Sequence, residues 1–128
     1  MNTKLRLTVL DGEYAIHRLL PEQDIPSSVL KNDFFAITRT GEELSIVCDI
    51  NTNIASEKSE KDWSCIKVLG PLDFALTGIL ARISNVLAEA EISIFALSTY
   101  DTDYILVKSN TLLASKKALK KAGYIFEN

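Results

Sequence analysis

Two short segments of the chain carry side chains whose types and spacing suit the binding of a small polar ligand. In the first, residues 70–78 (GPLDFALTG), an apolar run ends, the chain turns, and an apolar stripe at helical spacing begins. The unpaired backbone N–H groups at the start of a helix can hold a carboxylate. Asp73 lies beside them and could accept an ammonium group. One loop could therefore hold both charged groups of a zwitterion.

Gly78 adds to the interest of this segment. It falls inside the expected helix, where glycine costs about 1 kcal/mol relative to alanine. A close approach of backbone or ligand would explain a glycine there. An N-cap at Asp73 followed by a tight contact between helix and sheet explains the same residues equally well. Both interpretations stay open at this point.

The second segment, residues 98–103 (STYDTD), places two carboxylates, three hydroxyls and a phenol around one expected hairpin. Turns are commonly polar, so this composition alone proves little. In a split βαβ unit, however, the second strand ends at the sheet edge where the first loop begins. The two segments could therefore line one cleft. Acidic groups there would favour a ligand that carries an amine or a second positive charge.

The remaining reactive residues give little evidence for a catalytic or metal-binding site. His17 is the only histidine, which excludes a histidine-rich metal site. Cys48 and Cys65 lie in apolar runs without CxxC spacing and are expected to be reduced core residues. The common nucleophile and phosphate-loop signatures are missing. We expect no catalytic residue, no metal and no cofactor. A lysine cluster is interpreted as a solvated helix face: Lys116, Lys117, Lys120 and Lys121.

Composition excludes several classes of protein. The chain has 128 residues, is 47% hydrophobic and carries a net charge of −3, which suits one ordinary domain or two very small ones. Fourteen basic residues against seventeen acidic ones argue against a nucleic-acid partner. No apolar run reaches the roughly 18 residues that cross a bilayer, and residues 1–6 do not resemble a signal peptide. We expect a cytoplasmic protein.

The C-terminal half is predicted to be a split βαβ, ferredoxin-like unit. Strand-like runs end at turn residues, and two stretches switch to helical spacing. Gly123 ends the second helix. The expected elements are a strand at 63–69, a helix at 74–91, strands at 92–100 and 104–108, a helix at 111–122 and a strand at 124–126.

The N-terminal half repeats part of this pattern. Residues 34–40 align with residues 94–100 at an offset of 60, and Ile16 aligns with Ile66 at an offset of 50. The first repeat therefore lacks most of the long helix, for which only a turn or two near residues 27–31 can substitute. The predicted fold is α+β, with two tandem βαββαβ units of which the first has a shortened helix.

Unit boundaries follow from the polar stretch in the middle of the chain. Residues 50–62 are interpreted as a loop or short helix that links the units. The first repeat shows no final strand after Asp49, whereas residues 4–9 alternate cleanly and are expected to supply its edge strand. The predicted division is residues 1–62 and residues 63–128.

Together, the order of elements and the strings LDFALTGIL, RISNVLAEAEISI and FALSTYDTDYILV resemble ACT domains. More narrowly, they resemble the tandem-ACT subgroup that includes cytosolic arginine sensors of animals and the regulatory tails of aspartate kinases. The resemblance is strong over residues 63–126 and weaker over residues 13–49. It implies a regulatory module that binds a small ligand, commonly an amino acid, at an interface between ACT units.

Carried over by position, the resemblance also assigns site residues. The loop that holds the ligand's carboxylate and amine falls on Leu72, Asp73, Phe74 and the residues up to Gly78, including Thr77. The subgroup's Ser-Thr-aromatic segment and following acidic residue fall on Ser98, Thr99, Tyr100 and Asp103. Asp103 is then the expected partner of a cationic side chain.

The chain differs from the subgroup in three respects, and each difference leads to a further expectation. The animal sensors contain four such units and this chain has two, so a homodimer is expected. No catalytic domain is attached, so the regulated partner is expected to be a separate, unidentified protein. Pro21, Glu22 and Gln23 stand in place of the binding loop in the first unit, which is expected to buttress the second.

The leading hypothesis is a non-enzymatic cytoplasmic sensor of an amino acid or related metabolite. One alternative is a structural dimerisation module without a ligand, in which Phe74 and Tyr100 fill the cleft themselves. Another is an enzyme that uses Asp101 or Asp103 as a general base, for which the sequence offers no second catalytic residue.

Overall fold

The computed structural model describes residues 5–69 and 77–128, which form two compact units. The N-terminal unit is Gly12–Trp63. The C-terminal unit is Ser64–Asn128 together with the N-terminal residues up to Asp11. Both units mix strands with helical segments, so the fold is α+β, as predicted.

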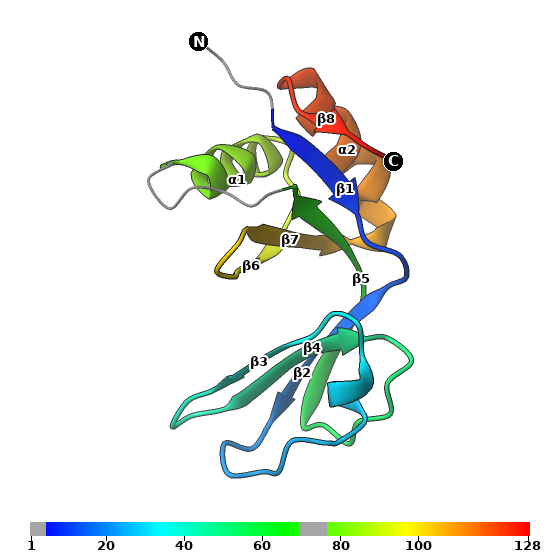
Figure 1. The fold of residues 1–128 in the computed structure, drawn as a ribbon, viewed down its shortest axis with the longest axis vertical. Coiled ribbons are helices and arrows are strands. Elements are labelled where there is room, and N and C mark those ends of the chain that lie inside the picture. Colours follow the sequence, from blue (N-terminus) through cyan, green and yellow to red (C-terminus); the bar gives the residue numbers. More distant parts are fainter. Residues whose placement is uncertain (1–4, 70–76) are drawn as a thin grey trace. The chain divides into compact units, whose positions relative to one another are not determined.

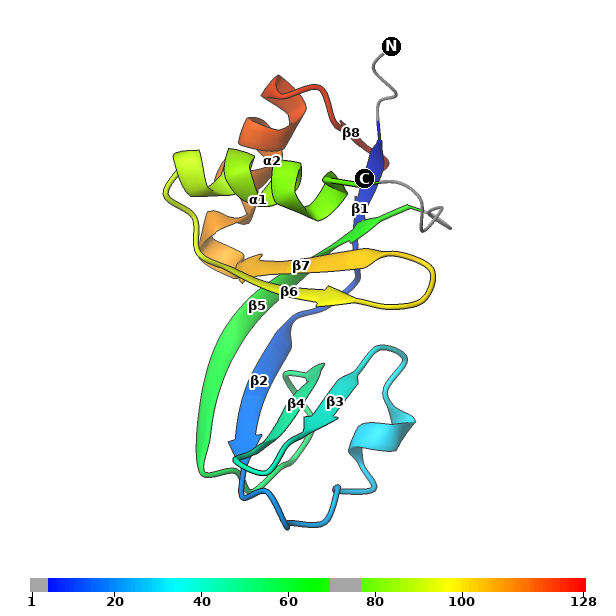
Figure 2. The ribbon, with the colours of Figure 1, turned by 90° about the vertical axis from the view of Figure 1, so that its left-hand side faces the viewer.

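The C-terminal unit has the predicted order of strand, helix, strand, strand, helix, strand. The second half of β5 leads to α1, the β6–β7 hairpin follows, and α2 precedes a short final strand. Helices α1 and α2 lie against the same face of the sheet (Figures 1 and 2). The elements are β5 (Lys58–Val68), α1 (Ile79–Glu89), β6 (Ile94–Ser98), β7 (Asp103–Lys108), a 3-10 turn (Ser109–Thr111), α2 (Leu112–Lys121) and β8 (Ile125–Phe126).

The core of this unit forms between the helices and the sheet. Ile79, Ile83 and Leu87 recur at helical spacing and present one buried face of α1. They pack on alternate residues of the strands, among them Ile66 and Val107. Burial of each such side chain stabilises the fold by about 1.5–3 kcal/mol.

The strands of the N-terminal unit lie in the order β3-β4-β2-β5, with the first half of β5 as the fourth strand. Its elements are β2 (Tyr14–Leu19), a 3-10 turn η1 (Val29–Lys31), β3 (Ala36–Arg39) and β4 (Leu44–Asp49). The three-residue turn η1 stands where the C-terminal unit has α1, which confirms the shortened helix. Val29 of η1 is fully buried against Leu19, Leu44, Ile46 and Cys48.

The N-terminal strand was predicted correctly but assigned the wrong neighbour. Strand β1 (Arg6–Val9) pairs antiparallel with residues 66–68 of β5 and parallel with β8, so it belongs to the C-terminal unit. The interpretation of residues 58–62 as a loop or helix is also wrong. They form the first half of β5 and pair with β2 in the N-terminal unit. Strand β1, which comes before the N-terminal unit in the chain, thus belongs to the C-terminal unit. Residues 58–62, which come just before the C-terminal unit, belong to the N-terminal unit.

The polar half of β5 shows why its sequence did not indicate a strand. All five side chains of residues 58–62 are exposed, so no apolar alternation marks the strand. A bulge interrupts its pairing with β2, and Asp62 there has a φ of 66°. Charged residues and a bulge are typical of an edge strand.

Helix α1 begins later than predicted. Its N-cap is Gly78, with a φ of 76° and a ψ of 6°, and Ile79 is its first residue. Gly78 therefore precedes the helix instead of lying within it, because a positive φ is incompatible with an α-helix and is readily adopted by glycine. The predicted N-cap, Asp73, lies outside the described residues.

Helices long and apolar enough to cross a membrane are absent from the described parts of the chain. The described helices are short and carry buried residues on one face.

Candidate functional site

The β6–β7 hairpin ends in a turn that is fixed by its own side chains. Residues 99–102 form the turn, and the backbone N–H of Thr99 donates to the carbonyl of Thr102 over 2.8 Å. The Thr99 hydroxyl also donates to that carbonyl, at 3.1 Å, and lies 3.3 Å from the backbone N–H of Thr102. The two threonines therefore hold the turn in one conformation.

Thr102 also attaches the turn to the end of β5. Its Oγ1 donates a 2.6 Å hydrogen bond to the carbonyl of Val68, the last residue of β5. The Thr102 side chain is buried, with 4% of the residue exposed. No sequence pattern distinguished Thr102 from the other polar residues of the turn. Its burial and its hydrogen bond to Val68 show that it anchors the turn to β5.

Ser98 and Asp103 face each other across the two strands. They are paired in the register of the hairpin, and the Ser98 hydroxyl donates to Oδ1 of Asp103 over 2.7 Å. Within the described residues, no lysine or arginine forms an ion pair with Asp103. A carboxylate held in this way can accept further hydrogen bonds from a cationic group.

Tyr100 and Asp101 form the exposed tip of the hairpin. Tyr100 is 81% exposed, so its ring does not fill a cleft as the dimerisation-module alternative required. Phe74, the other residue of that alternative, lies outside the described residues. The structure therefore brings four of the predicted residues together on one hairpin: Ser98, Thr99, Tyr100 and Asp103.

Of the predicted binding loop, residues 70–78, the structure describes only Thr77 and Gly78, which lie at the start of α1. Thr77 is exposed, and Gly78 adopts the left-handed conformation noted above. A Cβ on Gly78 would lie 3.0 Å from a guanidinium nitrogen of Arg82. Arg82, which follows Gly78 by four residues, was not predicted. Leu72, Asp73 and Phe74 lie outside the described residues.

His17 is buried and contacts a serine hydroxyl of its own unit. The residue is only 5% exposed, and its Nδ1 lies 2.9 Å from the hydroxyl of Ser56. Burial lowers the pKa of His17, and the positive charge of Lys61 lowers it further. The imidazole is therefore neutral at pH 7. The described residues contain no cluster of His, Cys, Asp or Glu that could hold a metal ion.

Both cysteines are free thiols in the protein interior, as predicted. Burial raises the pKa of Cys65 to about 12. Burial also raises the pKa of Cys48; the neighbouring Asp49 acts in the same direction, and a hydrogen bond with Thr52 opposes it. A thiol with a raised pKa is a poor nucleophile.

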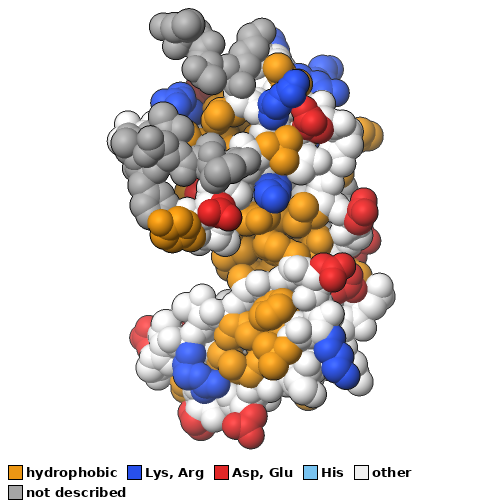
Figure 3. Space-filling model, viewed as in Figure 1, with side chains coloured by type: hydrophobic (Ala, Val, Ile, Leu, Met, Phe, Trp, Pro, Cys, Tyr) orange, Lys and Arg blue, Asp and Glu red, His pale blue; other side chains and the backbone are white. Residues whose placement is uncertain are grey.

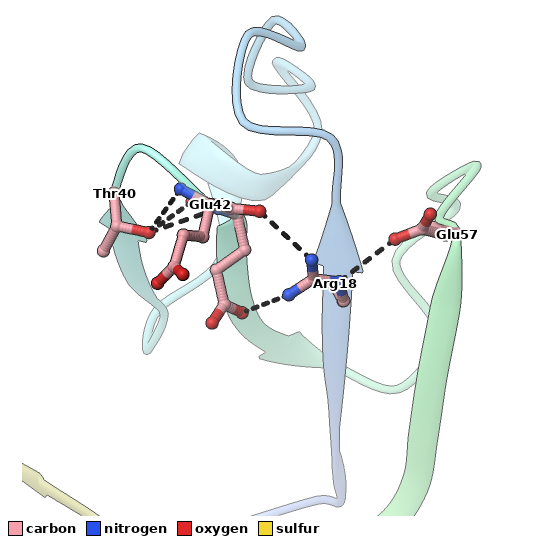
Figure 4. A network of polar contacts seen from close by, with 5 residues as sticks. Arg18, Thr40, Glu42 and Glu57 are labelled. Carbon is pink, nitrogen blue, oxygen red and sulfur yellow. Dashed lines mark hydrogen bonds and ion pairs between the residues drawn. The ribbon is translucent and has the colours of Figure 1, made fainter.

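The N-terminal unit uses its polar side chains to secure its own loops. Figure 4 shows Arg18 of β2 bound to three groups. Its Nε lies 3.1 Å from Glu57, one terminal nitrogen lies 3.5 Å from Glu43, and the other donates to the carbonyl of Glu42 at 3.1 Å. These contacts join the β3–β4 turn, β2 and the start of β5.

Residues 21–23, which stand in place of the binding loop in the N-terminal unit, are also held by hydrogen bonds within that unit. The Arg39 guanidinium donates to the carbonyls of Pro21 and Gln23. The Gln23 side chain accepts from the backbone of Leu20 and donates to the carbonyl of Ala55. The backbone carbonyls of Pro21 and Gln23 and the side chain of Gln23 therefore bond to other residues of the same unit.

Comparison with known sequences identifies the family. A sequence model of the ACT domain matches residues 58–121, half of the 128 residues. The chain belongs to the ACT-domain family. A second family model, described as an N-terminal domain, matches residues 12–57. The two matches meet at the start of β5, the strand that contributes to both units.

Among curated proteins, this ACT-family chain is similar to cytosolic arginine sensor for mTORC1 subunit 1. It is 32% identical to the protein of Pongo abelii over 112 residues, which cover 78% of this chain and 33% of the relative. The human protein is 34% identical over 90 residues. The chain spans about a third of the length of the curated relatives it matches.

Solved structures share the fold over nearly the whole chain. A protein of Agobacterium tumefaciens is 38% identical, with a TM-score of 0.89, covering 98% of this chain and 93% of that one. The regulatory subunit of aspartate kinase from Thermus flavus has a TM-score of 0.63 at 13% identity, covering 94% and 97%. At 13% identity, the similarity to the aspartate kinase regulatory subunit shows a shared fold only.

Proposed function

We propose that this ACT-family chain is a non-enzymatic sensor that binds a free amino acid at its C-terminal unit. The observation that carries the proposal is the β6–β7 hairpin. Its turn is fixed to β5 by Thr102, and it presents Asp103 with an oriented carboxylate and no cationic partner among the described residues. Such a group suits a ligand with a cationic side chain.

The proposed site combines the hairpin with the predicted loop. Ser98, Thr99, Tyr100 and Asp103 would contact the ligand side chain. The segment from Leu72, Asp73 and Phe74 to Thr77 and Gly78 would hold the α-carboxylate and amine. We assign no ligand to the N-terminal unit, because its corresponding segment is held by hydrogen bonds within that unit.

The proposal extends to the setting in which the sensor works. Its curated relatives are named cytosolic arginine sensors, which supports a cytoplasmic protein and a cationic amino acid as the ligand. We expect a homodimer, since two copies supply the four ACT units that the resemblance implies. Ligand binding would favour one packing of these units, and a partner protein would respond to that packing.

A thermal-shift screen of the full chain against the twenty proteinogenic amino acids tests the proposal. A ligand that binds only the native state raises the melting temperature once its concentration exceeds its Kd. We expect a selective rise with a cationic amino acid such as L-arginine. Asp103→Asn should abolish most of the rise, whereas Asp33→Asn, an exposed carboxylate of the other unit, should leave it unchanged.

A flat screen on folded protein would contradict the proposal and favour a dimerisation module without a small ligand. A rise that is equal for wild type and Asp103→Asn would keep the sensor function and overturn this assignment of the site.

A further inference from the structure

Helix α2 carries charges of one sign only. Its sequence, LLASKKALKK, contains four lysines and no acidic residue. The chain as a whole has a net charge of −3, so the rest of the chain is acidic on balance. The helix dipole favours cations in the last turn, which accounts for Lys120 and Lys121. It does not account for the absence of every acidic residue from the helix.

Three of the four lysines have no partner among the described residues. Lys116 is half-buried, and its Nζ donates to the backbone carbonyl of Asn128 over 2.7 Å. Lys117, Lys120 and Lys121 are exposed. The ion pairs of the described residues include none of these three side chains. Their charges are therefore available to a group outside the chain.

An exposed leucine lies in the same row as these three lysines. Leu113 precedes Lys117 by four residues and is 83% exposed. Residues three, four, seven and eight positions apart lie on one side of a helix, and like charges at these spacings repel each other. We call this row the lysine face, which consists of Leu113, Lys117, Lys120 and Lys121. It combines unbalanced positive charge with one apolar side chain.

Elsewhere in the described parts of the chain, basic and acidic side chains occur together. Arg6 forms an ion pair with Glu127, and Arg18 forms ion pairs with Glu43 and Glu57. Figure 3 shows basic and acidic side chains around the same face of the N-terminal unit. A solvated surface with both signs keeps its charges balanced, whereas the lysine face does not.

We propose that the lysine face binds an acidic segment of a partner protein, with an apolar side chain of that segment against Leu113. Carboxylates accept charge-assisted hydrogen bonds from lysine and would relieve the repulsion among the three ammonium groups. The row from Leu113 to Lys121 is about 12 Å long, which an extended segment covers with about four residues. The segment therefore carries an apolar residue and at least two Asp or Glu within about four positions.

A membrane or a nucleic acid fits the lysine face less well. A helix that lies on a membrane inserts an apolar face into the lipid. The apolar face of α2 instead packs in the core, where Leu119 is fully buried and Leu112 contacts the same cluster, so only Leu113 remains. The net charge of −3 opposes the approach of this chain to an anionic lipid surface or to phosphates. A local acidic segment avoids most of this repulsion.

This inference deepens the proposed function, because it names the chemistry of the partner. The role of the segment in signalling rests on the proposed function. Binding of the segment depends on the lysine face alone.

Fluorescence anisotropy of a labelled peptide tests the lysine face on the full chain. The probe has a central leucine with about four glutamates on each side, so that it can bind in either direction. We expect saturable binding that weakens as salt is added. The double variant Lys117→Glu and Lys120→Glu should bind at least about tenfold more weakly, because two attractive pairs become repulsive. Absence of binding to wild type overturns the proposal.

A matched double variant separates the lysine face from the total charge. Lys31→Glu and Lys58→Glu change the net charge by the same amount at exposed positions of the N-terminal unit, and should retain the affinity of wild type. The neutral double Lys117→Gln and Lys120→Gln adds no carboxylate near the negative end of the helix dipole and should also bind weakly. Equal losses at both locations overturn the proposal.

The apolar contact is tested by Leu113→Ser. The side chain is 83% exposed, so the melting temperature should not change, while binding of the leucine peptide should weaken several-fold. A peptide with serine in place of its leucine should not distinguish wild type from this variant. Equal affinity of wild type and Leu113→Ser for the leucine peptide overturns the apolar contact.

Two further measurements separate the alternatives. Vesicles of phosphatidylcholine and phosphatidylserine should not sediment with the chain, and sedimentation without peptide binding overturns a protein partner in favour of a membrane. Calorimetry with the proteinogenic amino acids on the same sample separates this inference from the proposed function. A chain that binds the peptide and no amino acid retains the lysine face and contradicts the sensor. A chain that binds an amino acid and no peptide retains the sensor and overturns this inference.

Discussion

The hydroxyl of Thr102 donates a 2.6 Å hydrogen bond to the carbonyl of Val68, joining the tip of the β6–β7 hairpin to the end of β5. The two residues are 34 positions apart in the chain, so the bond closes a long loop. Because the bond is buried, water cannot replace it easily. The tip of the predicted ligand-binding hairpin is therefore held to β5 by a side chain outside the predicted set of ligand contacts, in addition to the pairing of β7 with β5.

Replacement of Thr102 by valine should destabilise the protein while preserving the shape of the side chain. The buried carbonyl of Val68 would lose its donor, which costs about 1–3 kcal/mol of unfolding free energy. Thr102→Ser keeps the hydroxyl and should recover most of this loss. Urea unfolding of both variants checks the prediction. Equal losses for valine and serine would show that packing of the methyl group matters instead.

Gly78→Ala should destabilise the start of α1. Its φ of 76° is unfavourable for a residue with a Cβ, at about 1–2 kcal/mol, and the new methyl group would meet the guanidinium of Arg82 at 3.0 Å. Gly41→Ala is a matched control, since a Cβ there has no neighbour within 4 Å. Thermal unfolding should separate the two variants, and equal melting temperatures would contradict this explanation.

Acidification should reduce stability through His17. Its pKa is lower in the folded protein than the ordinary value of 6.5, because the charged form is poorly solvated there. The unfolded chain therefore binds a proton that the folded chain does not, and stability falls as the pH drops below about 6.5. His17→Asn should flatten this part of the stability curve. An unchanged pH dependence in the variant would contradict the assignment.

Thiol reagents should react slowly with the native protein. Burial raises the pKa of Cys65 to about 12 and raises the pKa of Cys48 as well, so little thiolate is present at pH 8. Addition of denaturant should release both thiols, two per chain. Labelling with Ellman's reagent measures the two rates. Fast labelling of one thiol in the folded protein would indicate an exposed cysteine.

Periodicity predicted the C-terminal unit well because its elements bury one clear face. The residues at helical spacing in α1, such as Ile83 and Leu87, are fully buried, and Gly123 ends α2 with a φ of 105°. Local patterns also identified β1 as a strand. They could not identify its partner, because strand pairing depends on residues distant in sequence, here Ile66 and Ile125.

The polar half of β5 and the start of α1 escaped prediction for different physical reasons. Residues 58–62 bury no side chain, so their role in the sheet leaves no hydrophobic signal. Gly78 was placed inside a helix because the apolar stripe continues through Leu76 and Ile79. In the structure a left-handed glycine interrupts that stripe. The hairpin residues were found from composition and resemblance, whereas the role of Thr102 needed coordinates.

Isothermal titration calorimetry with L-arginine, on the full chain and on Asp103→Asn, measures whether the hairpin carboxylate binds a cationic amino acid. We expect saturable binding to wild type and at least tenfold weaker binding to the variant. Loss of a charged hydrogen-bond partner costs about 1.5–3 kcal/mol, and about 1.4 kcal/mol corresponds to tenfold. Absence of binding heat for L-arginine and for every other amino acid, with folded protein, would contradict the sensor function.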